Sequence, residues 1–330
     1  MVRSPSGVWL VYALHAPYAS AMSMRMKLAA LLLACLPAGS AALERVADTH
    51  LHYKWSQQGV TTAADVIDIL EAQNIVMGVV IGTPAELALQ LVQLAPHRIV
   101  PLFSPYQSGG DWHNWAFDDS VVTRARTALA TGLYHGIGEL HLVGGFAPRL
   151  DKARVLPDLL KLAGEYDVPI MLHTEFSRPD LLLELCTQFP ETRILWAHAG
   201  AIQAPVDVAR VLSACDNVSA DLAARDPWRF VNHPIADARG RLLPEWRALF
   251  IEYQDRLLLG SDPVWPVDQL DRWDEPDTGW QELGRFWGFH RGWLQQLPAA
   301  AARKIGCENT VALFRRGGQV QCDPVAQDVR

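Results

Sequence analysis

Short apolar runs rich in β-branched residues alternate along the chain with stretches of helical periodicity. The runs cover residues 45–52, 75–82, 98–105, 136–143, 168–174, 193–200, 217–223 and 256–263. Between them, apolar residues recur at spacings of three and four, for example over residues 62–73, 84–95, 121–132, 158–166 and 179–189. This spacing is typical of amphipathic helices, and strands that alternate with helices predict a parallel sheet.

The number of predicted strands separates two parallel-sheet architectures. Eight strands in roughly 290 residues fit one (β/α)8 TIM barrel, which typically has about 250 residues plus insertions. A doubly wound open sheet usually carries a glycine-rich phosphate turn after its first strand; "GIGELH", residues 136–141, begins like one but has His141 in place of the third glycine. Residues 284–314 read as two further helices. We therefore predict an α/β fold: a single (β/α)8 TIM-barrel domain over residues 43–330, with C-terminal helices.

The N-terminal region has the layout of a secretory signal. Arg25 and Lys27 precede an apolar run over residues 28–36, and small residues follow it. This run is too short to span a bilayer as a permanent helix. We expect residues 1–42 to be an extension plus signal, cleaved near residues 40–42, and the mature protein to be exported, periplasmic and without a stable membrane span. A lipid anchor at Cys35 is the alternative, although Leu33 fits such a site poorly.

The amino-acid composition limits which kinds of binding partner are expected. The net charge is -7 with 20% charged residues, and the absence of a basic cluster argues against nucleic acid. This leaves a small-molecule substrate as the expected partner, and it is compatible with a homo-oligomer. An oxidising compartment permits disulfides among the remaining cysteines. Cys307 and Cys322 flank a helix-like segment and could close a C-terminal loop; four buried thiols, with Cys186 and Cys215, are the alternative.

Histidines and acids fall at the ends of predicted strands. In a barrel the carboxyl ends of all strands gather at one mouth, where active sites lie, and the period of two puts His50 and His52 on one face. Imidazole and carboxylate are ligands for zinc and similar ions. A bound metal lowers the pKa of its water towards about 7, and a nearby carboxylate can take the proton. One strand-end histidine alone is more often structural, so the prediction rests on the set: His50, His52, Glu139, His141, His173, His198 and Asp262.

This set resembles the amidohydrolase superfamily of metal-dependent TIM-barrel hydrolases. The resemblance lies in D-x-H-x-H on the first strand, with His, His and Asp after strands five, six and eight. "ILWAHAG", "RLLLGSDPVW" and "KIGCENTVALF" are similar to its amidohydrolase-related branch, which also contains aminocarboxymuconate semialdehyde decarboxylase. The likeness covers residues 45 to 315; the ligand set is specific as an ensemble, and each motif is less so.

The resemblance implies a role for each strand-end residue. His50, His52 and Asp262 would hold a first metal ion, and Asp262 would also be the general base for the water on that metal. His173 would be a further ligand. His198 would either polarise the scissile group of the substrate or bind a second metal. Asp262 and His198 are thus the implied catalytic residues.

Glu139 bears on the number of metal ions. In two-metal members of the superfamily, a carboxylated lysine or a glutamate on strand three or four bridges the ions. Glu139 on the fourth strand could do this, with His173 and His198 completing a second site; we expect zinc, with two ions favoured over one. Alternatively, Glu139 contacts substrate or orients a histidine. Asp48 shares the face of His50 and His52 at a deeper position, so we expect it to support the site by hydrogen bonding.

Substrate-binding residues are harder to predict. Arg225, after the seventh strand, could clamp a substrate carboxylate, or it could pair with Asp226 or Asp221. His141 could contact substrate or be a surface polar group. The candidates for the mouth of the barrel are Tyr53, Lys54, Trp55, His141, Arg225 and Trp265.

Three functions agree with these residues. The first is a metal-dependent hydrolase that cleaves an amide, ester, lactone or phosphoester bond of a small molecule. The second is a metal-dependent decarboxylase of an unsaturated carboxylic acid, which a basic residue aimed at the substrate carboxylate would favour. The third is a non-catalytic metal-binding protein, against which the complete ligand set with Asp262 argues. The sequence contains neither a G-x-S-x-G elbow nor a P-loop.

Overall fold

The computed structural model describes residues 44–142, 153–174, 178–229, 232–265 and 274–323. The predicted extension and signal over residues 1–42, with Cys35, lie outside these ranges. The described residues belong to one compact unit, Leu43–Arg330. Within them, no helix is both long enough and apolar enough to cross a membrane.

Parallel strands form the centre of the unit. Hydrogen bonding gives the orders β1-β2-β3 and β4-β5-β6-β7-β8. A parallel bridge from Phe103 to Ile137 joins β3 to β4, and the amide of Thr49 donates to the carbonyl of Leu259 over 2.8 Å, which joins β8 to β1. The strands are β1 (Val46–Lys54), β2 (Ile75–Thr83), β3 (Ile99–Leu102), β4 (Ile137–His141), β5 (Ile170–His173), β6 (Ile194–Trp196), β7 (Val218–Asp221) and β8 (Leu257–Leu258).

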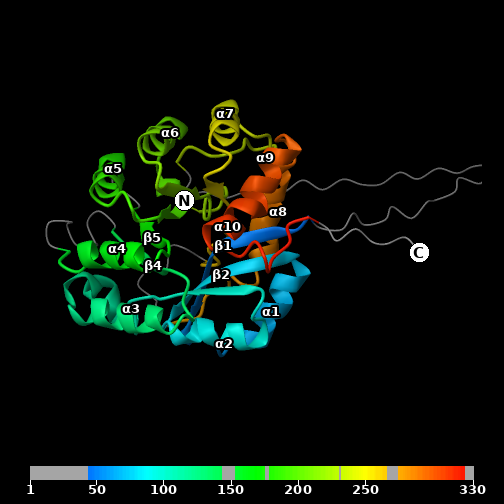
Figure 1. Ribbon diagram of the computed structural model, residues 1–330. Coiled ribbons are helices and arrows are strands. Elements are labelled where there is room, and N and C mark those ends of the chain that lie inside the picture. Colours follow the sequence, from blue (N-terminus) through cyan, green and yellow to red (C-terminus); the bar gives the residue numbers. More distant parts are fainter. Residues whose placement is uncertain (1–43, 143–152, 175–177, 230–231, 266–273, 324–330) are drawn as a thin grey trace, which may run out of the picture. The chain divides into compact units, whose positions relative to one another are not determined.

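A helix follows every strand, so the predicted (β/α)8 barrel is confirmed. Figure 1 shows these helices arranged around the strands. Local sequence explains several helix starts: Thr62 and Asp65 form a capping box at α1, and a proline stands in the first turn of α4 to α7. The helices are α1 (Ala63–Ala72), α2 (Glu86–Leu94), α3 (Ser120–Ala130), α4 (Leu156–Glu165), α5 (Pro179–Gln188), α6 (Pro205–Ala214), α7 (Pro244–Glu252) and α8 (Leu283–Leu294). Short helical turns are η1 (Trp55–Gln57), η2 (Gly109–His113), η3 (Trp115–Phe117) and η4 (Ala197–Gly200).

The C-terminal helices and two disulfides complete the unit. After α8, the chain runs through α9 (Ala299–Arg303), the π-helical η5 (Lys304–Glu308) and α10 (Asn309–Leu313), which follow one another without a break. The predicted Cys307–Cys322 disulfide is confirmed. A second disulfide joins Cys186 in α5 to Cys215 at the end of α6, so all four cysteines of the barrel are paired.

The apolar core has two parts, divided by the strands. One fills the space between strands and helices. The other lies inside the barrel and is built from Met77, Val79, Ile81, Val100, Leu102, Met171, Leu195 and Leu258, with Val311 and Phe314 from the C-terminal segment packed against it. The interior is therefore a packed core and not a pore.

Candidate metal and active site

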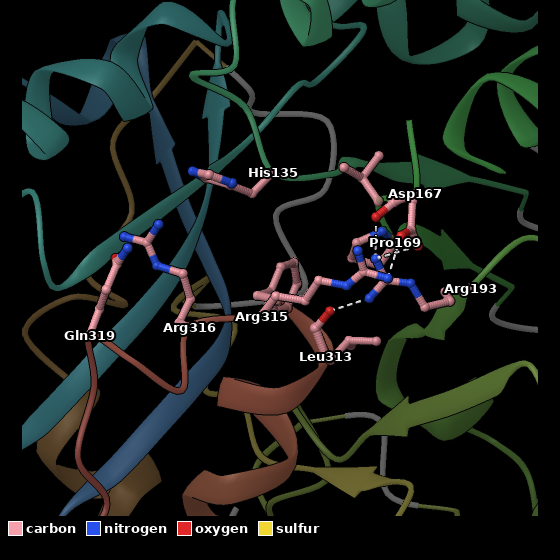
Figure 2. Close-up of a pocket in the computed structure, with 10 residues that line it drawn as sticks. His135, Asp167, Pro169, Arg193, Leu313, Arg315, Arg316 and Gln319 are labelled. Carbon is pink, nitrogen blue, oxygen red and sulfur yellow. Dashed lines mark hydrogen bonds and ion pairs between the residues drawn. The ribbon is translucent and has the colours of Figure 1, made fainter. Parts of the chain in front are cut away.

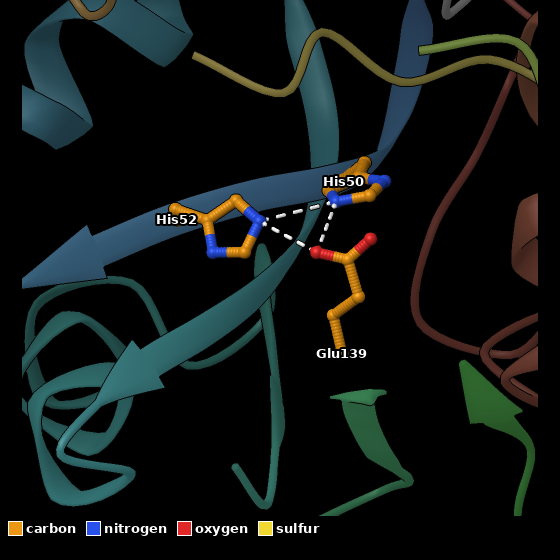
Figure 3. A group of neighbouring side chains, drawn as sticks. All are labelled: His50, His52 and Glu139. Carbon is orange, nitrogen blue, oxygen red and sulfur yellow. Dashed lines mark hydrogen bonds and ion pairs between the residues drawn. The ribbon is translucent and has the colours of Figure 1, made fainter. Parts of the chain in front are cut away.

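Strands β1 and β4 bring two histidines to one carboxylate oxygen. The Nε2 atoms of His50 and His52 lie 3.3 Å and 3.2 Å from Oε2 of Glu139, and 3.1 Å from each other. Figure 3 shows both rings directed from β1 towards this carboxylate. Glu139 is buried. Ring nitrogens that converge in this way on a buried carboxylate form a set of ligand atoms.

The other oxygen of Glu139 faces a second pair of histidines. Nδ1 of His173, at the end of β5, lies 2.7 Å from Oε1. Nε2 of His198, just after β6, lies 3.5 Å from the same oxygen. Glu139 therefore stands between two histidine pairs, with one oxygen towards each. This is the position that the bridging interpretation of Glu139 requires.

Asp262 faces both halves of the cluster. Its Oδ1 lies 3.5 Å from Nε2 of His52, and its Oδ2 lies 4.0 Å from Nε2 of His198. Asp262 and His198 both have left-handed backbones, with φ of 47° and 56°. Non-glycine residues seldom adopt this conformation, and those that do gather at functional sites. The buried Arg229 side chain supports Asp262, because it donates to the carbonyl oxygens of Ser261 and Asp262.

Asp221, at the end of β7, orients two of the histidines. Its Oδ2 lies 3.2 Å from Nδ1 of His50, and its Oδ1 accepts the amide hydrogen of His198 over 3.0 Å. Nδ1 of His198 lies 3.0 Å from the carbonyl oxygen of Ala223, which can only accept. Both imidazoles thus carry a proton on Nδ1, which leaves Nε2 as the ring nitrogen directed at the cluster around Glu139. We did not predict this role for Asp221, although its place at a strand end was the available signal.

Asp48 supports the site as expected. Its Oδ1 accepts the amide hydrogens of His50 and Ser261 over 3.0 Å and 2.9 Å, and its Oδ2 accepts the indole hydrogen of Trp287 over 2.9 Å. Burial raises the pKa of Asp48 to about 6, against the effect of these hydrogen bonds. Asp48 therefore ties β1 to the β8 loop and to α8.

The charges in the cluster fit a divalent cation. Burial alone would raise the pKa of Glu139, but His50, His173 and His141 hold it well below its ordinary value. Glu139 is thus an anion surrounded by imidazoles. Two groups of possible ligands share it, with all ligand atoms of each group within 4.8 Å of one another: His50, His52 and Glu139, and Glu139, His173 and His198. Nitrogen and carboxylate oxygen are the donors that zinc and related ions take.

Three of the candidate substrate residues lie at this end of the barrel. His141 is buried beside the cluster, with Nε2 3.4 Å from Oε2 of Glu139. Trp265 lies in the loop after β8, where its ring meets Phe286 edge-on. Lys54, at the end of β1, forms an ion pair with Asp277.

Two other candidates have different surroundings from those predicted. Tyr53 is buried in the core, and its hydroxyl donates to the carbonyl oxygen of Thr61; the alternation along β1 turns it away from the face of His52. The buried Arg225 donates to the carbonyl oxygens of His198, Ala199 and Gln203, and its guanidinium stacks over the Trp246 ring. Arg225 therefore braces the backbone after β6, because the chain turns sharply there and exposes its carbonyls to this side chain.

A separate cavity of about 260 Å³ lies at the opposite end of the strands. Figure 2 shows Arg193, Arg315 and Arg316 around it, with Asp167 between the first two. Asp167 pairs with both Arg193 and Arg315. Asp167 precedes β5 and Arg193 precedes β6, so both lie at the amino ends of their strands. The cavity is therefore distinct from the histidine cluster at the carboxyl ends.

Comparisons with known proteins give the family and the fold. A family model described as Amidohydrolase matches residues 48–316. Among solved structures, the TatD homolog YJJV from Escherichia coli K12 superposes with a TM-score of 0.56 at 20% identity, over 82% of this chain and 98% of that one. A zinc-bound amidohydrolase from Burkholderia multivorans gives 0.50 at 14% identity, over 82% and 99%. No curated protein matches the chain.

Proposed function

Because the chain belongs to the amidohydrolase family, we propose that it is a metal-dependent hydrolase of a small molecule. The bond is an amide, ester, lactone or phosphoester. The observation that carries the proposal is the placement of Glu139, with one oxygen towards each of two histidine pairs and Asp262 facing both.

We assign the ligands from the distances above. His50, His52 and Asp262 would hold one ion, His173 and His198 a second, and Glu139 would bridge them. Zinc suits this set of nitrogen and carboxylate donors. When bound, such ions polarise a carbonyl or phosphoryl oxygen and lower the pKa of water towards about 7.

Asp262 is the proposed general base. It is the carboxylate of the cluster with the greater solvent access, 12% for its side chain against 2% for Glu139, so a water molecule at the mouth reaches it first. A carboxylate in this position takes a proton as the nucleophile forms and returns it to the leaving group. Its left-handed backbone, fixed by Arg229, holds the carboxylate in this orientation.

His198 fits the role of ligand better than that of acid. Its Nδ1 proton is committed to the carbonyl oxygen of Ala223, so Nε2 offers a lone pair to the cluster. A neutral imidazole in this form can bind a cation, but it has no proton on Nε2 to give to a substrate oxygen. This supports two ions over one.

The decarboxylase alternative receives less support. A decarboxylase would be favoured by a basic side chain directed at the carboxylate of the substrate, and Arg225 was the candidate for this role. The guanidinium of Arg225 instead donates to three backbone carbonyls and stacks on Trp246. The hydrolase therefore remains the function that the site supports best.

The proposal is tested by metal analysis joined to a substrate screen. Protein produced with ample zinc is expected to contain two equivalents, and Glu139→Gln to contain one. Asp262→Asn is expected to keep its melting temperature and lose turnover of whichever lactone, amide, phosphoester or unsaturated acid the wild type converts. Asp158→Asn, an exposed carboxylate on α4, is the matched control and retains activity. Metal-free protein, or full activity in Asp262→Asn, would refute the proposal.

We also propose that the protein is exported to the periplasm. Two disulfides in the described part of the chain support this, because such bonds persist in oxidising compartments. Fractionation of cells, with thiol labelling of the recovered protein, tests it; cytoplasmic protein with reactive thiols would contradict the proposal.

A further inference from the structure

A buried tyrosine hydroxyl contacts His141 on the side of Nδ1. Tyr106, in the segment between β3 and η2, is 4% exposed. Its hydroxyl oxygen lies 2.8 Å from Nδ1 of His141 and 3.1 Å from the backbone nitrogen of the same residue. Both contacts are within the range of good hydrogen bonds. The Tyr106 hydroxyl therefore meets both the side chain and the main chain of one residue.

These two contacts determine where the protons lie. The backbone amide of His141 can only donate, so it gives its hydrogen to the hydroxyl oxygen of Tyr106. The hydroxyl hydrogen is itself buried and needs an acceptor. Of the two described partners of this hydroxyl, only Nδ1 of His141 can accept. Burial also raises the pKa of Tyr106 well above 10, which agrees with a phenol that keeps its proton.

The consequence appears at the other ring nitrogen. A neutral imidazole with an unprotonated Nδ1 carries its hydrogen on Nε2. Nε2 of His141 lies 3.4 Å from Oε2 of Glu139. This nitrogen therefore presents an N–H to the cluster, whereas the ring of His198 carries its proton on Nδ1, directed at the carbonyl oxygen of Ala223. Of the histidines around Glu139, His141 therefore has the opposite tautomer to His198.

Packing keeps the ring in this orientation. The Trp112 ring lies over His141 with centroids 3.7 Å apart, and the His173 ring lies 4.5 Å away. Between these rings the imidazole cannot rotate freely about its Cβ–Cγ bond. A donor whose direction is fixed in advance stabilises developing negative charge without reorganisation.

We propose that Tyr106 is a positioning residue that locks His141 as the Nε2–H tautomer, which makes His141 a hydrogen-bond donor at the active centre and not a metal ligand. In the resting protein the N–H is directed at Glu139. In the reaction it donates to the oxygen of the substrate on which negative charge develops. This second part rests on the proposed hydrolase function; the tautomer does not.

Nitrogen NMR of the full-length protein labelled with ¹⁵N-histidine tests the tautomer directly. The wild type is expected to show His141 with an unprotonated, hydrogen-bonded Nδ1 and a protonated Nε2. The signal is assigned by its loss in His141→Gln. In Tyr106→Phe the Nδ1 resonance is expected to move towards the value of a mixture of tautomers, while the metal content stays at that of the wild type. A wild-type His141 with an unprotonated Nε2 would overturn the proposal, even if Tyr106→Phe failed to fold.

Activity gives a second measurement and a matched control. Tyr106→Phe is expected to lower kcat by roughly tenfold to a hundredfold, with KM within about twofold, because the donor acts on the developing charge. Tyr53→Phe removes a buried hydroxyl that bonds to Thr61, and it is expected to leave kcat and the His141 resonances unchanged. Equal losses in the two variants would contradict a positioning role. Metal-free protein would refute the proposed hydrolase function. The NMR measurement would still show whether His141 is the Nε2–H tautomer.

Discussion

The buried side chain of Arg229 is predicted to stabilise the loops that carry the candidate site. The Arg229 and Asp226 side chains are both fully buried, and Nε of Arg229 donates to Oδ2 of Asp226 over 2.8 Å. The same guanidinium donates to the carbonyl of Ser261 over 2.7 Å and to that of Asp262, and it stacks 3.9 Å from the Phe286 ring. One side chain therefore joins the β7 loop, the β8 loop and α8.

Removal of this cation leaves a buried carboxylate without its ionic partner. Removing one partner of a buried ion pair costs about 3–5 kcal/mol of folding stability. Each kcal/mol of lost stability lowers the melting temperature of a large domain by roughly 2–4 °C. Arg229→Met is therefore expected to melt roughly 10 °C below the wild type, as followed by circular dichroism. The affinity for zinc should fall as well, because the backbone of Asp262 loses its anchor.

Two comparisons make this result specific. The double variant Asp226→Leu/Arg229→Met removes both buried charges, and it is expected to recover part of the loss. Arg285→Met is the matched control: this partly exposed arginine pairs with Glu282 and stacks on Trp228, so its loss costs at most about 1 kcal/mol. If Arg229→Met melted within about 2 °C of the wild type, the reasoning from the buried pair would be wrong.

Three further predictions concern the supports of the site and the disulfides. Asp48→Asn turns an amide NH2 towards the indole N–H of Trp287, and this should cost about 1–3 kcal/mol in chemical denaturation; an unchanged midpoint would contradict it. Asp221→Asn removes the acceptor that fixes Nδ1–H of His50, so competition with a chelator should show roughly 10–100-fold weaker metal binding, whereas wild-type affinity would show that the ring needs no such partner. Replacement of Cys186 and Cys215 by serine opens a loop with a sequence separation of 29, which should destabilise the fold by about 3–4 kcal/mol; a melting curve that matches the wild type would argue that the loop stays ordered without the bond.

The sequence by itself determined the class of fold, and it predicted the principal side chains of the candidate site. Local periodicity was sufficient for the strands, because each apolar run forms one strand that is buried on both faces. Even β8, described as only Leu257–Leu258, lies within its predicted run. His50, His52, His173, His198 and Asp262 were predicted from their places at strand ends, and the barrel rule alone implies that such ends converge.

Only the tertiary structure decided what each of these side chains meets. Asp48 and Trp287 are separated by 239 residues, and His50 and Asp221 by 171. Such pairs form when the barrel closes, so no local pattern contains them. For the same reason the sequence left Arg225 open between a substrate clamp and an ion pair, whereas the turn after β6 gives it three carbonyls to bind.

Proton positions depend on the tertiary structure most of all. The sequence shows only that His141 and His198 are histidines near strand ends. The hydroxyl of Tyr106 and the carbonyl of Ala223 give them opposite tautomers, because a neutral imidazole places its one proton according to the partner of each nitrogen. Chain pattern therefore determined which residues reach the mouth of the barrel, and the packing around each ring decided which present a lone pair and which present a proton.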